Sequence, residues 1–197
     1  MSHATGTARA LAHGWGLTSA LGIVLLTCLG TLVAPESVPL PQIFGYHELT
    51  APAGAVAGLG LCLATLSAAR EPAPQLLATA DAWRRAASPA RILAVGAVGV
   101  ASLCLLAGAS PHHAIVASAA LVGEGLLVAS VAGLSVAWSL PTMHMLAALV
   151  LGGAGRHGLS WWAWIIGADP SLGSWMASIG LAVLGLAAWT LRLRRPR

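Results

Sequence analysis

One carboxylate, Glu124, lies in the middle of a long apolar run, in the sequence Val-Gly-Glu-Gly-Leu. If that run crosses a membrane, a charge at its centre is costly, so the side chain should face the bundle interior or a cavity. Gly123 and Gly125 beside it would let a neighbouring backbone come close. Two roles stay open: a proton or cation site that contacts substrate, or an interhelical hydrogen bond to a Ser or His of a neighbouring span.

Histidine and methionine residues elsewhere give weaker signals. Met143-His144-Met145 carries the thioether and imidazole groups that soft metals bind. On a helix, residues two apart point about 200° apart, so both sulfurs cannot share a metal with His144. We expect Met143 and His144 at a helix start beside an inner turn, and solvated histidines at His112-His113 in an outer turn. The sequence therefore predicts no metal site.

Motifs for covalent or nucleotide chemistry are missing from the sequence. Cys28, Cys62 and Cys104 fall inside apolar runs without a CxxC spacing, which favours free thiols behaving as small hydrophobic groups. The sequence contains no GxSxG, HExxH, CxxCH or GxxxxGK[ST] motif. We expect no catalytic residue and no cofactor, so any ATPase activity would belong to a partner subunit.

The composition indicates a membrane protein. Of 197 residues, 57% are hydrophobic and only 8% are charged, against about 25% charged in a soluble domain. The mean hydropathy is +0.82. The formal net charge of +4 comes from arginines at the ends of apolar runs, which argues against nucleic-acid binding and for an orientation signal in a lipid bilayer.

Apolar runs predict an all-α, polytopic integral membrane protein with about six transmembrane helices in one domain, residues 1–197. The expected spans are 17–34, 53–69, 92–109, 114–138, 142–153 and 172–191. Prolines between 35 and 52 exclude a helix there, and Leu140-Pro141 is expected to form a turn. The fifth run is short, so it crosses only if it is extended or if the next segment dips back into the membrane.

Arginines assign the sides of these spans. If the N-terminus is inside, the outside segments contain one arginine, Arg156. The inside segments contain nine: Arg9, Arg70, Arg84, Arg85, Arg91, Arg192, Arg194, Arg195 and Arg197. Since cytoplasmic loops are enriched in Lys and Arg, both termini are predicted to be cytoplasmic. The absence of lysine points to a GC-rich, bacterial genome, and hence to the bacterial inner membrane.

The outer segment 155–175 is rich in tryptophan. Tryptophan prefers the membrane interface, where its ring is buried and its N–H stays wet. We expect a bent or re-entrant element there, broken at Asp169-Pro170, or alternatively an ordinary aromatic belt. The outer-interface residues are Arg156, His157, Trp161, Trp162 and Trp164; the basic pair should reach lipid head groups, or else contact substrate.

The inner loop 70–91 concentrates the charge. Within it, residues 75–87 predict a short amphipathic helix that ends at Ser88-Pro89. The helix could lie on the inner leaflet, be only a loop, or dock onto a cytoplasmic protein. The candidate docking residues are Leu76, Ala80, Trp83, Arg84 and Arg85, because Trp and Arg are typical interface anchors.

This arrangement resembles the permease subunit of type-2 ABC exporters: six spans, both ends inside, a cytoplasmic helix after the second span and a re-entrant element before the sixth. The resemblance is architectural. It implies a homodimer or heterodimer that works with a separate cytoplasmic ATPase, 75–87 as the coupling helix, and an amphiphilic or apolar substrate. The alternatives are a non-transporting subunit or assembly factor of a larger membrane complex, and a small ion-coupled, proton-coupled or metal-handling carrier that uses Glu124 and the histidines.

Overall fold

The computed structural model describes residues 16–33, 36–39, 50–70, 82–106, 111–152, 160–167 and 169–194, with the backbone alone for 82–87. Leu76 and Ala80 lie outside the described residues, as do Arg156 and His157. The side chains of Trp83, Arg84 and Arg85 also lie outside them, so the docking surface and the basic outer pair stay predictions.

Helices make up most of this structure. The longer ones are α2 (Leu17–Val33), α3 (Ala53–Ala68), α5 (Ala82–Leu106), α6 (Pro111–Ala132), α7 (Ser139–Leu151) and α8 (Leu172–Arg194), and a short 3₁₀ helix, η2 (Trp161–Ile166), precedes α8. The strands β1 (Ser37–Pro39) and β2 (Thr50–Pro52) pair antiparallel, with Val38 opposite Ala51. The prediction of a mostly helical fold is therefore confirmed.

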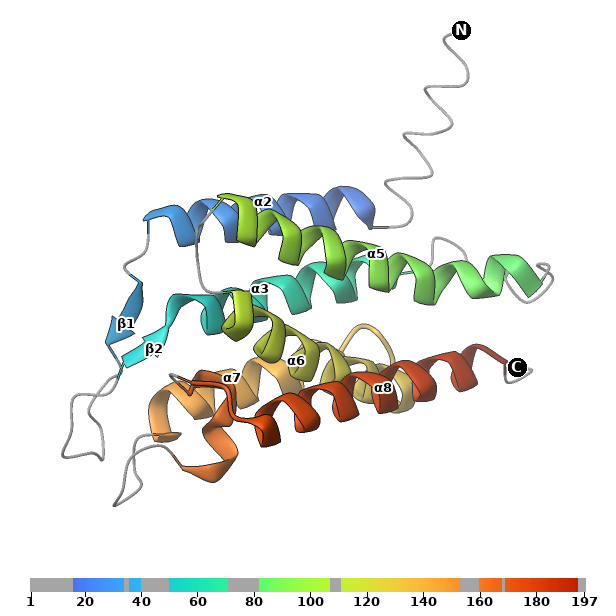
Figure 1. The fold of residues 1–197 in the computed structure, drawn as a ribbon. Helices are drawn as coiled ribbons and strands as arrows, with labels where there is room; N and C mark the ends of the chain where they lie inside the picture. The colour runs from blue at the N-terminus through green and yellow to red at the C-terminus, as the bar shows by residue number, and fades with distance from the viewer. Residues whose placement is uncertain are drawn as a thin grey trace, which may run out of the picture.

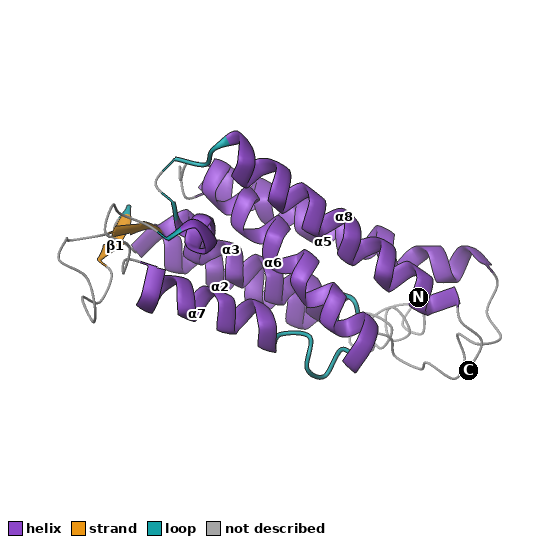
Figure 2. Ribbon diagram, turned by 90° about the horizontal axis from the view of Figure 1, so that it is seen from below, coloured by secondary structure: helices purple, strands orange, loops and turns teal. Residues whose placement is uncertain are grey.

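Each of the longer helices runs opposite to the one before it, so α2 begins and α8 ends at the same end of the bundle (Figure 1). The two strands lie at the other end (Figure 2). The larger core draws its residues mainly from α3, α6, α7, η2 and α8, and a smaller one mainly from α2, α3 and α5, with Ala114 of α6. Most residues of α3 and of α6 are buried, so these two helices are well enclosed.

Close backbone approach explains why glycine is placed where it is in α6. A Cβ on Gly123 would overlap the carbonyl of Leu181 in α8, and a Cβ on Gly185 would overlap Gly123. Here the two helices meet backbone to backbone, as small residues allow in membrane helices. The expectation that Gly123 admits a neighbouring backbone is confirmed.

Among the residues that the structure describes, three helices, α5, α6 and α8, are long and apolar enough to cross a membrane, judged by length and composition. Large apolar side chains of α8 point outward, with Leu172 77% and Met176 67% exposed. A surface of this kind suits lipid rather than water. The helices α2, α3 and α7 are apolar but shorter. Six spans would require these three shorter helices to cross the membrane as well.

The turn between the fourth and fifth predicted runs is not at Leu140-Pro141; that prediction is wrong. α6 ends at Ala132, and Gly133 adopts a φ of +103°, which makes the reversal. Pro141 is the third residue of α7. Proline fits the first turn of a helix because its missing N–H would have no partner there.

The prediction that a helix ends at Ser88-Pro89 is also wrong, because α5 runs from Ala82 through Pro89 to Leu106. Pro89 removes one hydrogen bond in the interior of the helix. Packing compensates at this point: Ser88 is buried, and its Oγ accepts a hydrogen bond of 3.3 Å from Nε1 of Trp189 in α8. The predicted inner-loop helix and the third span are therefore not separated at this site.

An arginine of α8 caps the C-terminal end of α6. Arg192 donates from Nη1 to the carbonyl oxygen of Ala129, and its guanidinium lies 5.8 Å from the ring centre of Trp189. The last carbonyls of a helix lack partners and carry a partial negative charge, which a cation stabilises. Arg192, Trp189 and Ser88 thus join α5, α6 and α8 at one end of the bundle.

Candidate functional site

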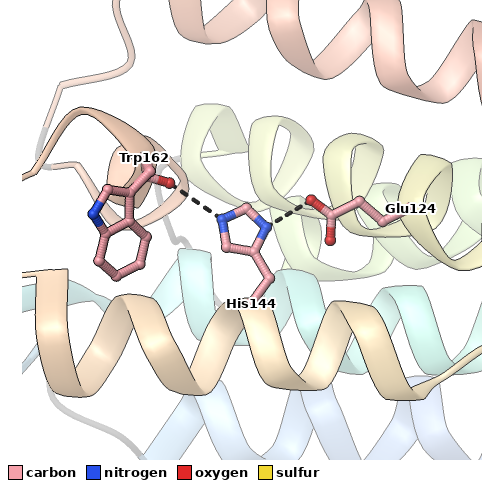
Figure 3. Close-up of polar contacts among 3 residues, drawn as sticks. All are labelled: Glu124, His144 and Trp162. Carbon is pink, nitrogen blue, oxygen red and sulfur yellow. Dashed lines mark hydrogen bonds and ion pairs between the residues drawn. The ribbon is translucent and has the colours of Figure 1, made fainter.

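A buried acid–base pair joins α6 to α7. Oε1 of Glu124 lies 2.6 Å from Nδ1 of His144 (Figure 3). The side chain of Glu124 is 10% exposed and that of His144 is 19% exposed. Of the two roles open for Glu124, the interhelical hydrogen bond to a histidine is present, and it involves two ionisable groups.

The second ring nitrogen of His144 is fixed by η2. Nε2 lies 3.2 Å from the main-chain carbonyl oxygen of Trp162 (Figure 3). A carbonyl oxygen only accepts hydrogen bonds, so Nε2 must carry the hydrogen. The tautomer of His144 follows from this contact, as it commonly does when one ring nitrogen is held.

The protonation of the pair follows in turn. With Nε2 protonated, either Glu124 is a neutral acid that donates to Nδ1, or its carboxylate accepts from Nδ1–H of an imidazolium. Both forms share one proton and have a net charge of zero. This is the least costly state for two ionisable groups among apolar helices.

Glu124 keeps one oxygen without a partner. Oε2 is buried and has no hydrogen-bond partner among the residues that the structure describes, and Glu124 as a whole is 8% exposed. In both proton arrangements Oε2 can only accept. A buried acceptor without a donor is costly and calls for an explanation, so this atom marks the place where a donor or a cation would be stabilised.

The Glu124–His144 pair lies away from the ends of both helices that contribute to it. Glu124 is about 20 Å from the first residue of α6 and about 12 Å from the last, at 1.5 Å per residue. His144 is near the middle of α7, a position it owes to the early turn at Gly133. The carbonyl of Trp162 is placed by η2, whose Ala163, Ile165 and Ile166 are buried in the core.

Few other ligating groups surround the pair. Cys62 of α3 is fully buried and lies within electrostatic range of Glu124. Within the described part of the chain, no group of three or more His, Cys, Asp or Glu could hold a metal ion. Met143 is 64% exposed whereas Met145 is buried, so the two sulfurs flanking His144 point apart, as the helical spacing predicts.

The start of α6 contacts the segment between η2 and α8. The ring of His112 meets that of Trp175 edge-on at 6.3 Å between centroids, and His113 lies near Gly167 and Asp169. Within the predicted bent or re-entrant segment, the structure describes the 3₁₀ helix η2, which ends before Asp169-Pro170. Its outer location stays a prediction.

The tryptophans of η2 do not form a uniform belt. Trp161 is 88% exposed, whereas Trp162 and Trp164 pack partly buried against the core.

What the sequence missed was the role of His144, which was expected at a helix start. The available signal was a lone carboxylate in one apolar run and a histidine inside the next.

Searches for related proteins identify no relative: no protein-family model, no curated protein and no solved structure matches this chain. The chemistry of the site is therefore what indicates the function of this chain.

Proposed function

We propose that the chain is a proton-linked membrane transport protein, with Glu124 and His144 as its proton-binding site. The observation that carries the proposal is the buried pair, which shares one proton and leaves Oε2 of Glu124 without a partner. An ionisable residue deep in a membrane helix is costly to keep, and such residues are typical of ion and proton pathways. A purely structural hydrogen bond would not need two ionisable groups.

The proposal includes a topology. The six longer helices would all cross the inner membrane of a bacterium, with both termini in the cytoplasm, as the arginine distribution indicates. α7 is too short to cross alone, since 13 residues span about 20 Å against about 30 Å of hydrocarbon. In this topology η2, which contacts α7, dips back into the membrane and fills the depth that α7 does not reach.

The experiment uses the full chain in liposomes that contain a pH-sensitive dye. Pools of small anionic, neutral and cationic solutes are added outside, one pool at a time. At least one pool should move protons across the membrane. Glu124→Gln should abolish this movement, because glutamine cannot ionise, although its amide can still donate to Nδ1 of His144.

Folding of the variant is checked by its elution profile in detergent and by its helical circular dichroism. Proton movement that is the same in the wild type and in Glu124→Gln would contradict the proposal. So would the absence of proton movement with all three pools.

A second candidate is the exporter permease predicted from the architecture. It is favoured by the continuity of α5, which would connect Trp83, Arg84 and Arg85 in its first turns rigidly to a membrane-spanning segment. A push on these residues from a cytoplasmic ATPase would then reach the bundle. Co-purification of a separate ATPase in mild detergent would support this candidate, whereas a different multi-subunit complex would favour the non-transporting subunit.

A further inference from the structure

Oε2 of Glu124 determines the chemistry of what could bind at the pair. It is an acceptor in both proton arrangements, it is buried, and no donor reaches it from the described residues. A ligand at this atom must therefore bring a donor hydrogen or a positive charge. An anion or a further carboxylate would be repelled.

Charge balance limits the ligand to one positive charge. The pair can lose only the proton that it shares, because Nε2–H of His144 is held by the carbonyl of Trp162. After that loss the pair has a net charge of −1. A monovalent cation restores zero, whereas a divalent cation would leave an uncompensated charge in an apolar core.

Around Glu124, α3 contributes the thiol of Cys62 and α7 contributes His144, whose ring is held in turn by the backbone carbonyl of Trp162 in η2. Arg192 of α8 contacts Ala129 near the end of α6.

The surroundings favour an organic cation over a metal ion. Metal ions such as Ca²⁺ and Mg²⁺ need several oxygen ligands, but the described residues contain no group of three or more His, Cys, Asp or Glu that could hold one. The core that α6, α7 and η2 share consists instead of apolar side chains, including Leu66, Leu121, Leu126 and Met145, with Trp162 and Trp164 packed against it. Such a site suits a cation that carries its own apolar surface.

We infer that the transported substrate is a small organic ammonium, a protonated amine with an apolar substituent, which binds Glu124 in place of the shared proton. One N–H of the ammonium donates to Oε2 and a second takes the place of the shared proton as the donor to Oε1 and Nδ1. The shared proton leaves to water, and His144 remains neutral with its hydrogen on Nε2. One positive charge enters and one leaves, so the site stays neutral. This inference rests on the proposed proton-linked function.

The binding experiment measures proton release. Hexylammonium is added to the purified full chain in detergent and weak buffer with a pH dye, with hexanol and sodium chloride as matched controls. Hexylammonium should release up to one proton per chain, and its apparent affinity should fall about tenfold for each pH unit below the range of release, because proton and amine compete. Hexanol and sodium chloride should release none.

Glu124→Gln should release no proton with any of the three compounds. Release by sodium chloride instead of hexylammonium, or hexylammonium binding that is unchanged in Glu124→Gln, would overturn the inference.

The transport experiment separates this inference from the function on which it rests. Glu124-dependent proton movement with the cationic pool alone supports both. If Glu124-dependent movement occurs with the neutral or anionic pool, the function stands and the substrate class is wrong. If no pool moves protons, the proposed proton-linked function is contradicted.

Discussion

At the scale of single residues, Glu124 and His144 stabilise each other only as a pair. Each alone would be a buried polar group without a partner, which costs about 1–3 kcal/mol. Replacing both partners of a buried pair by apolar residues of similar size is often neutral. The contribution of the pair to folding is therefore small, although the cost of breaking it is not.

Stability should follow this asymmetry. We expect His144→Phe to lower the free energy of unfolding by about 1–3 kcal/mol, because Glu124 loses its partner. The double variant Glu124→Leu/His144→Phe should recover more than half of that loss, since only the carbonyl of Trp162 is then left without its donor. Reversible unfolding in detergent micelles would measure both.

A double variant that is as unstable as His144→Phe would show that the loss comes from the packing of the ring. Neither variant should move protons in liposomes, which separates stability from function.

The sequence predicted that Glu124 would face the bundle interior but not which residue would be its partner. A carboxylate in an apolar run is visible from its neighbours alone. His144 is twenty residues away, and its contact depends on where the intervening turn lies. The carbonyl of Trp162 could not be predicted at all, because a backbone atom carries no sequence signal of its own.

At the scale of helices, the contact between α6 and α8 depends on small residues. Gly123→Ala should destabilise the bundle by about 1–3 kcal/mol, because the added Cβ overlaps the backbone of α8 at Leu181. The matched control is Gly180→Ala, since a Cβ there meets nothing within 4 Å. The control should leave stability unchanged or raise it by up to about 1 kcal/mol, as alanine favours helix.

Unfolding of both variants under the same detergent conditions provides the comparison. Equal effects at the two positions would mean that the approach of α6 and α8 is not close enough to require glycine. A shift of Glu124 away from His144 is a further expectation for Gly123→Ala, because Glu124 is the next residue along α6.

Apolar runs predicted the existence and order of the longer helices, since burial in lipid or in a core requires such runs. The apolar runs did not predict the residues at which these helices begin and end. Pro141 and Pro89 were interpreted as breaks, yet the first sits in an opening turn and the second within a helix supported by Trp189. Helix ends depend on tertiary contacts that a single sequence does not display.

At the scale of the whole molecule, an even number of spans places both ends on one side. We expect reporters fused before Met1 and after Arg197 both to be cytoplasmic, as the arginine distribution indicates. If only α5, α6 and α8 crossed the membrane, the two ends would lie on opposite sides. Reporter activity at each end in intact cells distinguishes the two arrangements.

The depth of Glu124 also has an electrical consequence. If α6 crosses the membrane as proposed, a charge that enters this site from either side crosses only part of the transmembrane potential, which acts on a full crossing with about 2.3 kcal/mol per 100 mV. About half of that path corresponds to about 1 kcal/mol. Occupancy of the Glu124–His144 pair by a proton would thus change about fivefold for each 100 mV, so voltage as well as acidity would load and empty it.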